Sequence, residues 1–102
     1  MLGAGGMMKQ VQKMQAEMAR IQNELADERI EGSAGGGMVK VVANGQQEIL
    51  DIAIAPEVVD PDDIETLQDL VLAAVRDAMK RSQDAAAEKM SKLTGGLKLP
   101  GM

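Results

Sequence analysis

Eight Lys and Arg side chains are the residues of this sequence whose type and spacing could do chemistry, because each can hold a phosphate group. They lie near the two ends of the chain, at Lys9, Lys13 and Arg20 and at Arg76, Lys80, Arg81, Lys89 and Lys92. Arg76 and Lys80 are four residues apart and would share one face of a helix. Arg81 and Lys92 each follow an acid four residues earlier, and such pairs support any exposed helix. Solubility charges are therefore an open interpretation beside phosphate binding.

Most other chemistry is excluded by composition. The 102 residues contain no Cys, no His and no aromatic residue, which removes thiol nucleophiles, imidazole bases and the usual zinc sites. The glycines of residues 32–37 are not followed by the Lys and Ser or Thr of a phosphate loop. Asp60, Asp62 and Asp63 lack the other ligands of a calcium loop and are explained by helix capping. We therefore predict that the protein is not an enzyme and uses no metal, cofactor or small-molecule substrate.

The charge of the chain is unevenly distributed. The formal net charge of −5, taken as a whole, argues against a nucleic-acid partner. The acids, however, are concentrated between residues 24 and 71, and residues 56–71 contain no Lys or Arg. Both ends of the chain are therefore basic, although the chain as a whole is acidic.

The sequence carries no signal for a membrane. No apolar run approaches the roughly 20 residues that a membrane span needs. Residues 1–8 lack the basic and apolar regions of a signal peptide. A cytosolic protein without a membrane partner is expected.

The first group of basic residues lies on a predicted helix from residue 7 to residue 27. Its apolar residues alternate in spacing between four and three, at Met7, Val11, Met14, Met18, Ile21 and Leu25. This heptad seam has the a and d spacing that requires another helix as a partner. The seam most simply belongs to the core or to a dimer interface, and a methionine-lined binding groove is the alternative.

A three-stranded antiparallel meander is predicted after that helix. Its strands cover residues 29–34, 38–43 and 47–54, and a glycine turn separates the first two. Asn44-Gly45 is the strongest short-range signal for a hairpin between the last two. In the third strand, Leu50, Ile52 and Ile54 would share one face.

A second long helix is predicted from Pro61 to about Lys92, with Asp60 as its N-cap and Gly95-Gly96 as its end. Its first half is apolar on almost all sides, and beyond Arg76 it is polar enough to project from the core or lie on a partner. The candidate core or dimer contacts are Val11, Met14, Met18, Ile21 and Leu25 on the first helix and Leu67, Leu70, Val71 and Val75 on the second.

The order helix, meander, helix predicts a single α+β domain over residues 1–102, with flexible ends at residues 1–6 and 94–102. The core must consist of aliphatic residues and some of the nine Met residues. A chain of this size buries only about 60–70 % of its unfolded surface. Association of copies is therefore expected.

An ordered set of motifs extends through nearly the whole chain. They are Met8-Lys9-Gln10 with the heptads that follow, Glu31-Gly32-Ser33-Ala34-Gly35-Gly36-Gly37, Val39-Lys40-Val41 running to Asn44-Gly45, Ile54-Ala55-Pro56-Glu57, Leu67-Gln68-Asp69-Leu70-Val71 with Ala73-Ala74, Asp77-Ala78, Glu88-Lys89-Met90, Leu93-Thr94-Gly95-Gly96-Leu97 and Leu99-Pro100-Gly101. On these residues the sequence resembles the YbaB/EbfC family of nucleoid-associated DNA-binding proteins. Arg76 stands where that family often has Asn, and this difference adds a positive charge.

The resemblance implies a bacterial homodimer that is joined through its sheets and central helices. Paired helices would project like tweezers, hold DNA and alter its conformation. The resemblance further implies a cytoplasmic protein of the nucleoid that contributes to chromosome organisation and gene regulation, and it brings no catalytic motif. The eight basic residues named above are then the candidate DNA contacts.

The expected function is thus binding of double-stranded DNA, mainly through its phosphates. The missing aromatic residues exclude stacking platforms for single strands. No helix-turn-helix with base-reading residues is evident, so we expect low sequence specificity. The alternative is a non-enzymatic scaffold in which the heptad seam and the second helix bind another protein.

Overall fold

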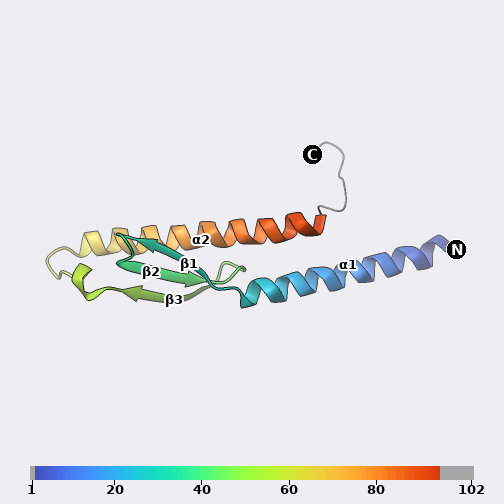
Figure 1. Ribbon diagram of the computed structural model, residues 1–102, viewed down its shortest axis with the longest axis horizontal. Coiled ribbons are helices and arrows are strands. Elements are labelled where there is room, and N and C mark those ends of the chain that lie inside the picture. The colour runs from blue at the N-terminus through green and yellow to red at the C-terminus, as the bar shows by residue number, and fades with distance from the viewer. Residues whose placement is uncertain (1, 95–102) are drawn as a thin grey trace, which may run out of the picture.

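The computed structural model describes residues 2–94, and the side chains of residues 6–93, as one sheet and two long helices (Figure 1). Helix α1 spans Leu2–Asp27, strands β1, β2 and β3 span Ile30–Ala34, Val39–Ala43 and Ile49–Ile54, the 3-10 helix η1 spans Pro56–Val58, and helix α2 spans Ile64–Thr94. The predicted α+β fold, with a three-stranded antiparallel meander between two helices, is confirmed. Of the ends predicted to be flexible, Met1 and residues 95–102 lie outside the described residues, while residues 2–6 begin α1.

The molecule is elongated because both helices continue past the same end of the sheet (Figure 1). Its extents are 73 × 27 × 16 Å, and its radius of gyration is 19.9 Å. A compact domain of 100 residues would have a radius of gyration of about 13 Å. The sheet and the first half of α2 therefore form the body, and the rest of the helices form a projecting pair.

The core lies between α2 and one face of the sheet. Strand β2 is central and pairs antiparallel with β1 and β3. Its alternating residues Val39, Val41 and Ala43 are fully buried, as the period of two in a strand requires. They pack with the fully buried Ala74 and Ala78 of α2. Small side chains on α2 let the helix lie very close to the sheet.

Gly32 is the position where α2 and β1 approach most closely. A Cβ atom added at Gly32 would lie 2.3 Å from the backbone N of Ala78 and 2.8 Å from the backbone O of Ala74. The Ser33 N–H in the same strand donates to Asp77 Oδ2 of α2 at 3.0 Å. The absence of a side chain at Gly32 thus sets the distance between helix and sheet.

The loop between β2 and β3 contacts both helices. Ser82 Oγ of α2 donates to the Asn44 carbonyl at 2.7 Å and accepts from the Gln47 N–H at 3.0 Å, and Ser82 is fully buried. The Gly45 N–H donates to the Leu25 carbonyl of α1 at 2.7 Å. Because α1, the loop and α2 share these bonds, the direction in which α1 leaves the body is fixed here.

This hairpin differs in detail from the predicted one. Strand β3 begins at Ile49 rather than residue 47, so the connection is a loop and not a two-residue Asn44-Gly45 turn. Gln47 takes the left-handed backbone conformation, with φ of 63°. Gly45 serves instead for close approach, since a Cβ there would lie 2.6 Å from Leu25 Cδ2.

Strand β3 is an exposed edge strand. Its pairing with β2 shifts between Val42 and Ala43, which leaves Leu50 without a partner and breaks the predicted alternation at the start of the strand. All six residues of β3 are exposed, including Ile52 and Ile54. The structure therefore leaves an apolar strand uncovered.

The start of α2 corrects the prediction that Asp60 is its N-cap and Pro61 its first residue. The helix begins at Ile64, and Asp63 is the cap: its Oδ1 accepts from the Thr66 N–H at 3.3 Å and its Oδ2 from Thr66 Oγ1 at 2.7 Å. These bonds lower the pKa of Asp63. Asp60 instead closes the preceding turn, with Oδ1 accepting from the Asp62 N–H at 2.9 Å.

We expect Gly32→Ala to lower the free energy of unfolding by about 3 kcal/mol, because the new Cβ must push α2 away from the sheet. Gly36→Ala is the matched control. Its Cβ would meet nothing within 4 Å, so only the left-handed backbone at φ of 66° costs energy, about 1 kcal/mol. Denaturant unfolding of both variants measures the difference, and equal losses would contradict this account of the helix–sheet contact.

Candidate nucleic-acid interface

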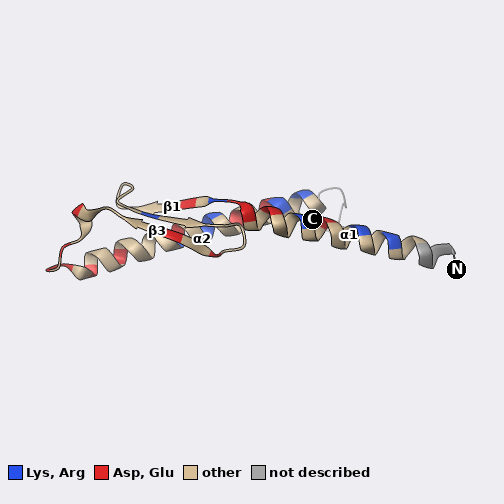
Figure 2. Cartoon of the chain, turned by 90° about the horizontal axis from the view of Figure 1, so that it is seen from below, with Lys and Arg blue, Asp and Glu red and all other residues tan. Residues whose placement is uncertain are grey.

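The projecting helices form a charged groove between them. Side chains of both helices line a cavity of about 510 Å³: Glu17, Arg20, Ile21, Glu24, Ala85, Glu88, Lys89, Lys92 and Leu93. Blue segments of the ribbon gather on the projecting parts of the helices, with some red among them, whereas the charged segments at the opposite end of the molecule are red (Figure 2). The fold therefore converts the basic ends of the sequence into one end of the molecule.

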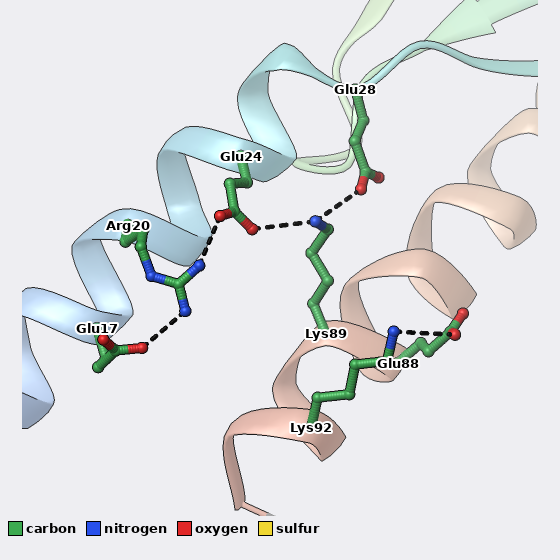
Figure 3. Close-up of polar contacts among 7 residues, drawn as sticks. All are labelled: Glu17, Arg20, Glu24, Glu28, Glu88, Lys89 and Lys92. Carbon is green, nitrogen blue, oxygen red and sulfur yellow. Dashed lines mark hydrogen bonds and ion pairs between the residues drawn. The ribbon is translucent and has the colours of Figure 1, made fainter.

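The centre of this groove is an ion-pair network that crosses from α1 to α2 (Figure 3). Lys89 Nζ lies 3.1 Å from Glu24 Oε2 and 3.1 Å from Glu28 Oε1. Arg20 reaches Glu17 at 2.7 Å and Glu24 at 2.6 Å on the same helix. Glu24, Glu28 and Lys89 are called the cross-helix clasp below, since they are the residues that tie the two helices together electrostatically.

Neighbouring charges in this network shift the pKa values of Glu24, Lys89 and Arg20. Hydrogen bonding to Lys89 first, and then to Arg20, lowers the pKa of Glu24. Glu28 and then Glu24 raise the pKa of Lys89. The carboxylates of Glu17 and Glu24 raise the pKa of Arg20. Each group is thus held in its charged form at neutral pH.

The eight candidate DNA contacts divide into two groups. Five are ion-paired: Arg20 and Lys89 in the network, Lys80 with Asp84 at 3.1 Å, Arg81 with Asp77 at 3.2 Å, and Lys92 with Glu88 at 3.7 Å. Among the described residues, Lys9, Lys13 and Arg76 have no ion pair within 4.0 Å. The within-helix pairs of Arg81 and Lys92 are those predicted from their spacing.

Sequence reasoning missed the cross-helix clasp. Its members lie far apart in the chain, so no spacing rule for a single helix joins Lys89 to Glu24 or Glu28. The only available signal was that both helices would carry complementary charges once they were packed side by side.

The predicted core and dimer residues occupy different environments. Ile21 and Leu25 are buried, and Leu70, Val71 and Val75 are half-buried against the core. Val11, Met14 and Met18 are exposed in the single chain. An apolar groove of about 440 Å³, called the β3–α2 groove below, is lined by Ile54, Leu67, Gln68, Val71, Leu72 and Val75. That a partner molecule covers these exposed apolar residues stays a prediction.

No group of three or more His, Cys, Asp and Glu side chains within residues 6–93 could hold a metal ion. None of the helices in the described part of the chain is long and apolar enough to cross a membrane. The groove between α1 and α2 thus offers charge rather than a metal centre.

The geometry defines a class of protein that presents paired, charged helices from a small α+β body. Comparison with known proteins identifies the family within that class. The model of the YbaB/EbfC DNA-binding family matches residues 1–97, and the chain belongs to this family. That family is a DNA-binding family and not an enzyme family.

Individual relatives agree with the family match. The chain is 57 % identical over 96 residues to a nucleoid-associated protein of Pelotomaculum thermopropionicum, covering 94 % of this chain and 91 % of the relative. It is 60 % identical over 96 residues, with the same coverage, to a nucleoid-associated protein of Desulforamulus reducens. The crystal structure of an uncharacterized Helicobacter pylori protein superposes with a TM-score of 0.68 at 26 % identity, covering 92 % of this chain and 91 % of that one.

The pKa shifts give the clasp a pH window. The Glu24 contribution to stability is present above its unfolded pKa near 4.5 and is lost as pH falls through the lowered folded value. The Lys89 contribution is present below its unfolded pKa near 10.5 and is lost as pH rises through the raised folded value. The clasp therefore stabilises the helix pair between these two limits.

We expect Lys89→Gln to lower the melting temperature at pH 7 and to flatten its dependence on pH below 4.5, because Glu24 then loses its main partner. Lys80→Gln is the control, since the Lys80–Asp84 pair lies within α2 and is more exposed. Its effect should be clearly smaller, because exposed pairs contribute about 0–1 kcal/mol. Thermal melts across this pH range test the expectation, and indistinguishable pH profiles for Lys89→Gln and the wild type would refute it.

Proposed function

We propose that this protein binds double-stranded DNA mainly through backbone phosphates held by the basic residues of α1 and α2. The observation that carries the proposal is the separation of charge along the molecule, with Lys and Arg on the projecting helices and the acids of residues 56–71 at the other end (Figure 2). A duplex presents dense negative charge and attracts a surface of this kind. The acidic end would be kept away from it.

The unpaired cations are the strongest candidates for first contact. No ion pair among the described residues includes Lys9, Lys13 or Arg76. These three side chains can therefore bind a phosphate without first giving up a carboxylate partner. The exposed pairs of Lys80, Arg81 and Lys92 contribute about 0–1 kcal/mol each, so DNA phosphates can replace their carboxylate partners. Six of the eight predicted contacts are thus available in two energetic classes, whereas Arg20 and Lys89 would first have to leave the ion-pair network.

Low sequence specificity is part of the proposal. The chain has no aromatic residue to stack on a base. The two α-helices within residues 2–94 are separated by the sheet and do not form a helix-turn-helix. Phosphate contact and the shape of the duplex then provide most of the recognition.

We further propose that the protein works as a homodimer joined through β3 and the β3–α2 groove. The outer edge of β3 carries unpaired backbone groups, and Ile52 and Ile54 on it are exposed. Leu72, beside the groove, is 47 % exposed. Covering this apolar surface with a second copy would remove it from water and double the number of basic helix ends.

The cellular role proposed here follows from the relatives, which are named nucleoid-associated proteins. The dimer would lie on the nucleoid in the cytoplasm, alter DNA conformation, and contribute to nucleoid organisation and gene regulation. The alternative is a protein-interaction scaffold that uses the heptad seam and α2, in which the bases serve only solubility.

We expect duplex affinity to fall steeply with salt, with a log–log slope that loses about 0.9 for each phosphate contact removed. Lys13→Gln should therefore weaken binding several-fold at low salt and make the slope shallower. Lys40→Gln is matched in charge but lies on β2, and it should change little. Gel shifts across a salt series measure this, and a salt-independent affinity or equal effects of the two variants would favour the scaffold alternative.

The dimer predicts that Leu72→Glu lowers the mass of the particle, because a charge would be buried in the interface. Leu72 is exposed in the single chain, so the variant should still fold. Ala73→Glu is the control, since Ala73 is an exposed neighbour on α2 outside the β3–α2 groove. Sedimentation equilibrium at micromolar concentration decides the question, and an unchanged mass for Leu72→Glu would contradict this interface.

A further inference from the structure

The heptad seam of α1 changes environment along its length. Leu25 and Ile21 are 2 % and 4 % exposed: Gly45 of the β2–β3 loop packs on Leu25, and Ile21 lines a groove with Ala85 and Leu93 of α2. Further toward the N-terminus, exposure rises to 41 % at Met18, 54 % at Val11 and 67 % at Met7. The last side chain of α2 that reaches the seam in the described residues is Leu93, which lines a groove with Met14. The distal seam (Met7, Val11, Met14 and Met18) thus continues an existing helix–helix contact and is largely exposed within the described residues.

The surroundings of the distal seam suit another helix. The flanking e and g positions are Met8, Gln10, Gln15 and Glu17, of which Glu17 alone is charged, and it pairs with Arg20 of the same helix. Lys9 and Lys13 are at f and c, on the side of the helix away from the seam. A second α1 could therefore approach the seam without placing like charges in contact.

We propose that the distal seam is a second self-association surface, on which α1 of one copy pairs antiparallel with α1 of another copy. Antiparallel pairing brings Val11 opposite Met14 and Met7 opposite Met18, so every apolar layer is filled in one register. A parallel partner would meet α2, which already lies against the seam at Ile21. Residues 7–18 would overlap over about 18 Å of helix.

This surface is separate from the β3–α2 groove, which lies on the body of the molecule. Copies joined at both surfaces would form chains or rings of dimers. Pairing would also place the Lys9 and Lys13 stripes of the two helices on opposite outer sides. On the proposed DNA binding, which this consequence rests upon, such an assembly would bridge two duplexes.

The first experiment compares masses without DNA. Val11→Gln with Met14→Gln keeps good helix formers but removes the apolar layers, so sedimentation equilibrium should give a lower mass than for the wild type, because the seam no longer joins copies. Ala16→Gln with Ala19→Gln is the control, since both alanines are exposed and off the seam, and it should keep the wild-type mass. An unchanged mass for Val11→Gln with Met14→Gln would overturn the proposal, whether the β3–α2 interface exists or not.

The second experiment tests the register. The chain has no Cys, so any disulfide reports only introduced thiols. When Val11→Cys and Met14→Cys proteins are mixed and oxidised, the disulfide joining the two variants should dominate, because these positions face each other. A mixture of Ala16→Cys and Ala19→Cys should give little. Cross-linking no greater in the first mixture than in the second would overturn the antiparallel pairing.

The third experiment separates this inference from DNA binding itself. Wild-type protein should carry a free duplex to a duplex tethered on beads, while Val11→Gln with Met14→Gln should bind a single duplex as before but fail to bridge. Equal bridging by both proteins would overturn a bridging role for the seam. If neither protein binds a single duplex, the proposed function fails, while the mass comparison still decides whether the seam associates.

Discussion

The placement of both projecting helices depends on one buried hydrogen-bonded loop. The loop from Asn44 to Gln47 receives and donates bonds through Ser82 of α2, and its Gly45 N–H holds the last turns of α1 at the Leu25 carbonyl. A buried hydroxyl must keep such partners, because leaving them unmade costs the full desolvation of the groups. The loop therefore acts as the joint from which α1 leaves the body, and every property of the helix pair presupposes it.

Beyond that joint, the helix pair is held by charge and by apolar contact together. The clasp of Lys89 with Glu24 and Glu28 lies close to the sheet, and further out Ile21 lines a groove with Ala85 and Leu93 of α2. The clasp carboxylates and a DNA phosphate attract the same ammonium group. On the proposed DNA binding, the clasp would keep Lys89 in position before a duplex arrives, and the cost of exchanging partners is small only for the exposed pairs.

The sequence predicted most of the fold because its signals are local. The heptad spacing marks α1, and the alternating Val39 and Val41 mark β2. The N-cap was misplaced because Asp60 and Asp63 are both capping residues; Asp63 caps the helix through Thr66, while Asp60 closes the preceding turn. The clasp could not be predicted at all, since it depends on how two helices far apart in the chain are packed. For the same reason, the sequence could not show which of the eight basic residues have no ion pair among the described residues.

The elongated shape has a consequence for encounter with DNA. Over 73 Å, the acids of residues 56–71 occupy one end, while the projecting helices at the other end carry bases together with the acids of the ion-pair network. The screening distance in 0.1 M salt is only about 10 Å, so a charged polymer interacts with the nearer end of the molecule alone. On the proposed DNA binding, the two ends would therefore meet a duplex independently, and the orientation of the protein would be selected only at close approach.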